Sequence, residues 1–202
     1  KIIREYEISD YKNKTELSGI KLDTLMCTTL RSYQNIVSLN KNKKGLELVV
    51  ESSGALFDAI TYEDLVDETI NYLTKLVNQC TQIPAYNLSA LGIYCDADVF
   101  QLLEARGDFS HLDSVDDIEN ISDAASILIS RSIAEQRHIY TPNSFVLNMQ
   151  SSSAKTVIFY MEGFSLLSKQ DISLIDLFAS NTKTSFDNEE LRHELDEGQR
   201  EI

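Results

Sequence analysis

Apolar residues recur at steps of three and four along the first third of the chain, the spacing that places them on one face of an α-helix. The stripe runs from residue 22 to 37 and, after the polar run 41–44 and Gly45, resumes as far as residue 57. Because a glycine inside a helix costs about 1 kcal/mol relative to alanine, the pattern predicts a long helix with a weak point near 40–45. The stripe consists of Leu22, Met26, Leu30, Tyr33 and Val37, followed by Leu46, Val49, Val50, Ser53 and Phe57.

Two further helices are predicted to begin where a hydroxyl residue precedes a carboxylate by three positions. Thr61 with Asp64 precedes an apolar face that ends near Cys80, and Ser114 with Asp117 opens a second such face. In this arrangement the two side chains satisfy the unpaired amides of the first helical turn. Helix capping therefore accounts for these acidic residues without any functional role.

Between and after these helices the apolar period shortens to that of β-strands. Residues 87–96 and 99–109 predict two strands joined by a short acidic turn, and 138–142, 144–150 and 155–163 are rich in β-branched and aromatic residues. Strands at hairpin spacing favour an antiparallel sheet with helices gathered on its faces. The fold class predicted is therefore α+β.

The last helix is predicted to begin at Ser168 with Asp171 and to run to the end of the chain. It carries a seven-residue repeat, typical of helices that pair with another helix, in which a polar middle lies between apolar ends. The alternative for Leu174 to Phe186 is an ordinary amphipathic helix that lies on the sheet. The positions predicted for a dimerisation or signalling helix are Leu174, Leu177, Asn181, Thr184, Asn188, Leu191 and Leu195.

Composition and charge limit the classes of partner. The 202 residues include 18 basic and 32 acidic side chains, a net charge of −14, and 43% are hydrophobic. Such a surface repels phosphate backbones and anionic lipid, so we expect neither nucleic-acid nor membrane binding. Three widely spaced cysteines, Cys27, Cys80 and Cys95, are typical of reduced thiols, and the expected location is the cytoplasm.

No pattern of catalytic or metal-binding residues is evident in the sequence. The histidines, His111, His138 and His193, fit no metal-ligand spacing, and neither a CxxC pair nor a glycine-rich phosphate loop occurs. We therefore expect no enzyme activity, metal or cofactor in this chain. Aromatic residues in the predicted strands either line a ligand cavity or form ordinary core, and Arg106 either pairs with an anionic ligand or lies on the surface. The candidates for cavity lining are Tyr94, Phe100, Arg106, Tyr140, Phe145 and Tyr160.

Three stretches resemble a bacterial response-regulator family: DYKNKTELSGIKL (10–22), LRSYQNIVSLNKNKKGLELVVESSGALF (30–57) and FASNTKTSFDNEELRHELDEGQREI (178–202). In that family a receiver domain is followed by a GAF-like domain of unknown function and often by an HD-GYP phosphodiesterase. The resemblance implies that residues 1–40 are the end of a receiver and a connecting helix. It implies a GAF-like regulatory domain at 41–170 and a signalling helix at 171–202.

The same resemblance places Lys14 where receivers carry the lysine that contacts the phosphoryl group. The rest of a receiver is absent, so we expect no phosphate sensing from Lys14. No HD dipeptide occurs, and His193 is followed by Glu194. Cyclic di-GMP hydrolysis, which the resemblance implies for a full-length protein, is therefore not expected of this segment, which we interpret as part of a longer chain.

Three functional hypotheses follow. The first is a regulatory relay and homodimerisation module, in which the first and last helices connect the adjacent receiver to the adjacent output domain. The second is a small-molecule sensor whose GAF-like cavity binds an unidentified ligand. The third is a protein-docking surface on the acidic face.

Overall fold

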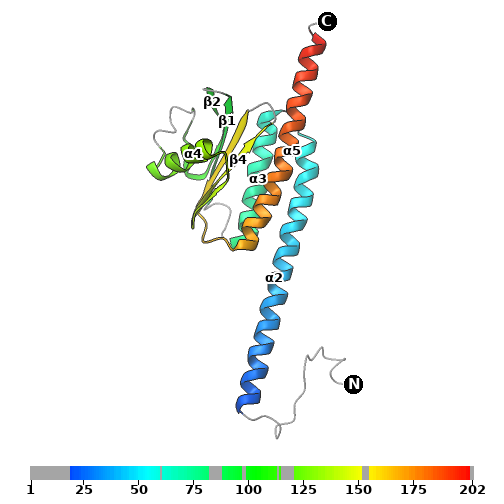
Figure 1. Cartoon of the computed structure of the whole chain (residues 1–202), viewed down its shortest axis with the longest axis vertical. Coiled ribbons are helices and arrows are strands. Elements are labelled where there is room, and N and C mark those ends of the chain that lie inside the picture. The colour runs from blue at the N-terminus through cyan, green and yellow to red at the C-terminus, as the bar shows by residue number, and fades with distance from the viewer. Residues whose placement is uncertain are drawn as a thin grey trace. The chain divides into compact units, whose positions relative to one another are not determined.

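The protein is described by a computed structural model (Figure 1). It describes residues 19–59, 61–81, 88–96, 99–112, 114, 121–151 and 155–200, with side chains between residues 21 and 192 of these ranges. By its internal packing the chain divides into two compact units, 1–41 and 42–202. Lys14 and the other residues before 19 lie outside the described residues.

Helices and strands follow the predicted order, and the α+β class is confirmed. In the described part of unit 1, helix α2 carries the predicted stripe, and its side chains, from Leu22 to Val37, are exposed. The elements are α2 (Gly19–Phe57), α3 (Tyr62–Thr81), β1 (Ser89–Asp96), β2 (Val99–Arg106), the short 3-10 helix η3 (Gly107–Phe109), α4 (Asp123–Glu135), β3 (Ile139–Tyr140), β4 (Ser144–Gln150), β5 (Thr156–Glu162) and α5 (Lys169–Arg200).

Among the described residues, five strands form one antiparallel sheet in the order β2-β1-β5-β4-β3. The central strand β5 pairs with β1 on one side and with β4 on the other, so that Tyr160 lies opposite both Leu91 and Val146. Successive side chains of a strand point to opposite faces of the sheet. The alternation along β5 therefore divides the core into two layers.

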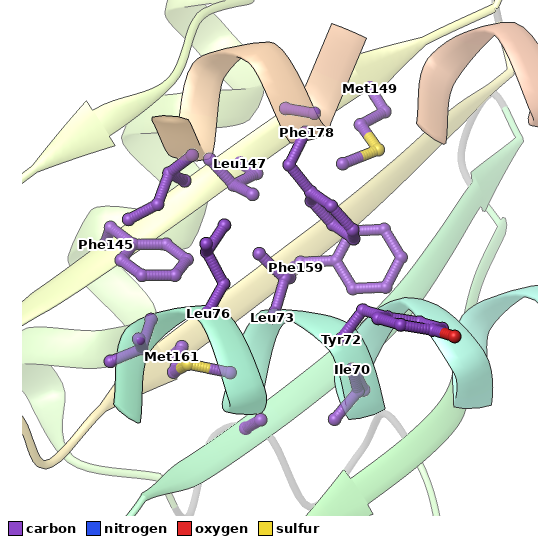
Figure 2. Close-up of a cluster of buried hydrophobic side chains, with 14 of the residues drawn as sticks. Ile70, Tyr72, Leu73, Leu76, Phe145, Leu147, Met149, Phe159, Met161 and Phe178 are labelled. Atoms are coloured by element: carbon purple, nitrogen blue, oxygen red, sulfur yellow. The ribbon is translucent and has the colours of Figure 1, made fainter. Parts of the chain in front are cut away.

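One layer lies between the sheet and the helices α2, α3 and α5. Gly92 of β1 allows close approach of α3, because a Cβ atom at this position would lie 2.4 Å from Cγ1 of Val66. Figure 2 shows how side chains of α3 and α5 meet those of β4 and β5. The buried members include Ile70, Leu73 and Leu76 of α3, Phe145 and Leu147 of β4, Phe159 of β5 and Phe178 of α5.

The second layer lies on the opposite face of the sheet, beneath α4 and η3. Ala125 and Ile129 of α4 and Phe109 of η3 pack on Ile158 and Tyr160 of β5. The rings of Phe109 and Tyr160 have centroids 5.8 Å apart. Apolar side chains of α4 and η3 thus cover the β1, β5 and β4 part of this face among the described residues.

Two of the three predicted helix starts are confirmed. The backbone amide of Asp64 donates to the Thr61 hydroxyl (3.1 Å), and that of Asp171 donates to the Ser168 hydroxyl (3.2 Å). The third prediction placed a start at Ser114 with Asp117. Asp117 lies outside the described residues, and the described helix α4 begins at Asp123, where Ser122 accepts from the amide of Ala125 (3.3 Å).

Candidate functional site

Helices α2 and α5 run parallel and in register within unit 2 (Figure 1). The side-chain amide of Asn42 donates to Gln170 Oε1 (3.4 Å), and that of Asn181 donates to the Ser53 hydroxyl (3.0 Å). In both pairs the partners are separated by 128 positions. A constant offset over about three helical turns requires the two helices to run in the same direction.

Gly45 and Leu174 form a close contact between these helices. A Cβ atom at position 45 would lie 2.6 Å from Cδ1 of Leu174, so glycine leaves room for the leucine side chain. Leu174 is only 7% exposed. It therefore lies in the core of its own domain rather than on the predicted outward seam. The helix α2 continues through Gly45, so the predicted weak point serves close packing.

In unit 2, helix α2 carries two apolar stripes one position apart. The inner stripe contains Val49 and Leu56, which are buried against the rest of the domain. The outer stripe contains Leu46, Val50 and Phe57, which are 46%, 74% and 54% exposed. The outer stripe is therefore apolar surface that the domain does not itself bury.

The seven-residue pattern of α5 likewise divides between the core and the surface. The helix lies on its own sheet through a face that includes Ile175, Phe178, Ala179, Thr182 and Phe186, as the alternative interpretation of 174–186 expected. The outward positions are Leu177 (43% exposed), Thr184 and Leu191 (53% exposed), with Asn181 and Asn188 half-buried beside them. The side chain of Leu195 lies outside the described ones.

These outward residues form one continuous surface across the two helices. Near its beginning is a groove of about 390 Å³, whose lining includes Leu46, Leu174 and Leu177. At its middle lies the Asn181–Ser53 hydrogen bond, and at its end the Arg192 guanidinium lies 5.4 Å from the centre of the Phe57 ring. We define the α2–α5 face as Leu46, Val50, Ser53 and Phe57 of α2 with Leu177, Asn181, Thr184, Asn188 and Leu191 of α5.

The aromatic residues predicted to line a cavity are not brought together. Phe145 lies in the layer facing α3 and α5, whereas Tyr160 lies in the layer facing α4. Phe100 is exposed on the edge strand β2, and Tyr94 is half-buried against the Tyr62 ring. The Tyr140 hydroxyl donates to Asp176 of α5 (2.6 Å), and burial together with this carboxylate raises the pKa of Tyr140.

Arg106 is engaged within the domain. Its guanidinium donates to the side chains of Asn71 (2.6 Å) and Glu104 (3.0 Å) and pairs with Asp67. The bonds to Asn71 and Asp67 attach the end of β2 to α3. Arg106 thus has a structural role that its position after an apolar strand did not reveal.

The α5 half of the face was predicted from the seven-residue spacing, whereas the division of α2 into an inner and an outer stripe was not predicted. The missed signal was the recurrence of apolar pairs, Val49–Val50 and Leu56–Phe57, seven positions apart. A helix that needs only one buried side carries a single stripe. Paired apolar residues at this spacing predict a helix with apolar side chains on both its buried and its outward side.

The described residues hold neither a metal cluster nor a membrane-spanning helix. No group of three or more histidine, cysteine, aspartate or glutamate side chains among them is placed to hold a metal ion. None of the helices in the described part of the chain combines the length and apolar character needed to cross a membrane.

Comparison with known proteins places the chain in a family. A model described as "Domain of unknown function (DUF3369)" matches residues 26–195. A protein of Vibrio cholerae serotype O1 named 3'3'-cGAMP-specific phosphodiesterase 2 is 24% identical over 208 residues, covering 100% of this chain and 38% of that protein. The chain therefore spans well under half of this relative.

One solved structure shows the fold, and a second, which superposes less closely, covers more of this chain. A chain described as a GAF sensor protein from Burkholderia vietnamiensis superposes with a TM-score of 0.53 at 8% identity, covering 75% of this chain and 94% of that one. The GAF domain of a sensor histidine kinase from Pseudomonas syringae pv. tomato gives 0.46 at 13% identity, covering 83% and 97%. The chain belongs to the DUF3369 family, a domain of unknown function, and its fold is GAF-like, as the resemblance in its sequence implied.

Proposed function

We propose that this domain is a non-catalytic relay that pairs with a second copy through the α2–α5 face. The observation that carries the proposal is an outward apolar surface on two parallel helices that are held in register. None of the residues that define the face is charged, in a chain of which 25% is charged. The charged side chains at its two ends, Lys169 in the groove and Arg192 beside Phe57, are basic. On a strongly acidic protein this is the part of the surface on which two copies repel each other least.

The apolar area of the face is large enough to offset the cost of association. Full burial of a leucine, valine or phenylalanine side chain stabilises by about 1.5–3 kcal/mol. The exposed fractions of Leu46, Val50, Phe57, Leu177 and Leu191 lie between 43% and 74%, so about half of this gain remains available at each residue. Summed over two copies this is on the order of 10 kcal/mol, which is similar in size to the cost of association. Burial of these side chains therefore offsets that cost, and the proposal predicts a dimer at tens of micromolar protein.

A parallel arrangement of the two copies suits a relay. In unit 2, α2 enters at the level of Asn42 and Gln170, and α5 continues past the level of Phe57 and Arg192. The end that receives a signal and the end that transmits it are thus opposite ends of one helix pair. A twofold axis along the helices would bring both transmitting ends together, whereas an antiparallel pair would separate them.

For the longer protein we propose the arrangement that the sequence resemblance implies: a receiver before this domain and a phosphodiesterase of the HD-GYP type after it. The name of the V. cholerae relative, a 3'3'-cGAMP-specific phosphodiesterase, supports a cyclic-dinucleotide output. In this role the domain passes a change in helix packing from one neighbour to the other. A helical interface with polar residues between apolar ends, such as Asn181 and Thr184 between Leu177 and Leu191, is suited to two alternative packings.

The small-molecule sensor stays a prediction. Its candidate lining residues lie on both faces of the sheet or on its edge, so they do not define one cavity. No described feature favours this hypothesis over the relay, and the same holds for docking on the acidic surface.

The mass of the protein in solution tests the proposed dimer. Multi-angle light scattering at tens of micromolar is expected to give twice the monomer mass for the unchanged chain. Val50→Asp should give the monomer mass, because it places a charge in the centre of the face at a residue that is 74% exposed and so does not contribute to the core.

Ile127→Asp is the matched control, because Ile127 is a comparably exposed apolar residue (64%) on α4, away from the face. This variant should remain dimeric. A monomeric wild-type chain, or the same mass for both variants, would refute pairing through this surface.

A further inference from the structure

Apolar contacts alone do not fix the level at which two copies would meet along the α2–α5 face. Val50 and Phe57 are seven positions apart on α2, and Leu177 and Leu191 are fourteen positions apart on α5. A second copy displaced by one seven-residue repeat along the helices would therefore still bring apolar residues opposite apolar residues. A unique level requires a group whose hydrogen bonds are satisfied at that level and not at the neighbouring ones.

Asn181 is such a group, because a hydrogen bond to α2 fixes the orientation of its side-chain amide. The Ser53 hydroxyl donates to the backbone carbonyl of Val49 (2.9 Å), so its oxygen is left to accept. It accepts from Nδ2 of Asn181 (3.0 Å), and both side chains are half-buried. The nitrogen of the amide is therefore directed to α2.

The oxygen of the same amide is open on the surface. No described residue donates a hydrogen bond to Oδ1 of Asn181, and this atom remains accessible to water. Because the Asn181–Ser53 bond joins the two helices, the amide lies on the line between them, in the middle of the face. An amide carries both a donor and an acceptor, so the Asn181 side chains of two copies can bond each other reciprocally.

The other polar side chains of α5 on this face lack this arrangement. The Thr184 hydroxyl donates to the carbonyl of Ser180 in its own helix (3.1 Å). Asn188 has the same side chain as Asn181 one repeat later, but α2 ends at Phe57 before that level, at the offset of 128 positions that relates the two helices. Asn181 is thus the amide of the face that α2 itself holds in place.

We propose that the Asn181 side chains of two copies meet at the twofold axis and exchange hydrogen bonds, and that this contact fixes the level of the pair. The inference rests on the proposed pairing through the α2–α5 face. In a pair displaced by one repeat, one of the two Asn181 amides would lie at the level of Leu174, which offers no hydrogen bond. An amide that is buried without a partner opposes that displaced pair.

This contact also limits how the relay can change its packing. Asparagine in an otherwise apolar seam fixes the register of paired helices at a cost in stability. Because the Asn181 contact opposes sliding of one copy along the other, the two alternative packings of the relay would differ by rotation of the helices about their axes. Asn181 thus determines the specificity of the pairing and the kind of motion that passes through it.

Disulfide formation in a mixture of two single-cysteine proteins measures the level of the pair. Val50→Cys and Phe57→Cys are made in a chain with Cys27→Ser, and the oxidised products are separated by mass. The two positions lie about 10 Å apart along α2, whereas a disulfide requires Cα atoms within about 7 Å of each other. Each protein is expected to cross-link with itself, and the mixed product to stay below about a tenth of the total, because an unpaired buried amide shifts the equilibrium by about tenfold or more.

With Asn181→Leu in both proteins, the mixed product should become a major one, because apolar contacts alone permit displaced pairs. Light scattering on a dilution series should also show that these pairs persist to about tenfold lower protein concentration, since leucine removes the cost of a polar residue in the seam. A purely structural role of Asn181 within one copy predicts neither result.

Asn42→Leu is the matched control, because Asn42 also bonds across the two helices, to Gln170 (3.4 Å), but lies outside the residues that define the face. It makes the same change of side chain and should leave the mixed product rare. If the mixed product is equally rare in Asn181→Leu while light scattering still gives the dimer mass, the role of Asn181 is refuted and the proposed pairing stands.

A monomer mass for the unchanged chain would instead refute the pairing itself, and with it the role of Asn181. Should Asn181→Leu fail to fold, Asn181→Cys decides in the same Cys27→Ser chain. A disulfide of Asn181→Cys with itself supports the meeting of the two side chains. Its absence under conditions in which Val50→Cys cross-links would overturn it.

Discussion

Gly45 and Gly54 lie in the same helix but have different surroundings, and this difference allows the α2–α5 contact to be measured. A Cβ atom at Gly45 would lie 2.6 Å from Leu174, whereas one at Gly54 would meet no atom within 4 Å. Replacing an exposed helical glycine by alanine stabilises by about 1 kcal/mol. At Gly45 the same gain is opposed by the displacement of the Leu174 side chain, which lies in the close contact between the two helices.

We predict that Gly54→Ala raises the free energy of unfolding by about 1 kcal/mol and that Gly45→Ala gives clearly less. Gly45→Ile, whose side chain cannot fit, should destabilise by about 1–3 kcal/mol. Urea denaturation at one protein concentration gives all three values. Equal stabilisation by alanine at both positions would show that α2 and α5 are not in close contact at Leu174.

His138 makes the stability of the sheet edge depend on pH. Its Nδ1 accepts a hydrogen bond from the backbone amide of Asn148 (3.0 Å), which requires the neutral imidazole. Burial lowers the pKa of His138 below its ordinary value of 6.5, and the charge of Asp176 only partly opposes this. A folded-state pKa below the unfolded one gives stability that is complete above about pH 6.5 and is lost as the pH falls.

We therefore expect the urea midpoint to decrease between pH 7.5 and 5, and to decrease less in His138→Gln, which has no charge to gain. Both proteins share the titrating carboxylates, so the difference between the two pH profiles isolates the histidine. Parallel profiles for the two proteins would show that protonation of His138 does not oppose folding.

At the scale of elements, the strands and helices could be predicted because each differs from its neighbours in apolar period and is bounded by capping or turn residues. The strands 89–96, 144–150 and 156–162 fall within their predicted ranges, and the caps at Thr61 and Ser168 are formed. Periodicity could not show which of two neighbouring stripes on α5 faces the sheet. By spacing, Leu174 belongs to the outward side of the seven-residue pattern. It lies inward because its side chain occupies the space left by the missing side chain of Gly45, 129 positions earlier in the chain. Such a contact between distant segments leaves no local signal.

The ion pair between Lys155, next to β5, and Glu190 of α5 could not be predicted for a similar reason. A lysine beside a strand and a glutamate in a charged helix are both typical of exposed surface, and only the folded arrangement places them 3.2 Å apart. The predicted cavity-lining residues are not brought together for a different reason. The two-residue period of a strand predicts that an aromatic side chain is buried, but not into which of the two core layers it points. Tyr160 and Phe145 therefore looked equivalent in the sequence although they lie on opposite faces of the sheet.

At the scale of the whole molecule, self-association depends on which surfaces are apolar and exposed. Two copies together carry twice the net charge of −14, so association requires a surface that buries apolar area without bringing carboxylates together. The α2–α5 face meets this requirement through neutral residues alone. Pairing through it in parallel would place both α5 ends side by side, as a relay to a shared output requires.

Cross-linking of single cysteines tests this central claim most directly. Cysteine is introduced at Leu46 or at Phe57 in a chain with Cys27→Ser, since Cys80 and Cys95 are buried. A helix rises about 1.5 Å per residue, so the two positions lie about 16 Å apart along α2, beyond the reach of a short bis-maleimide. Leu46→Cys and Phe57→Cys are each predicted to cross-link with themselves, and Ile127→Cys on α4 is predicted to form no cross-link although the protein still pairs. Cross-links that form only in a mixture of the first two proteins, or in none of them, would contradict a parallel dimer through the α2–α5 face.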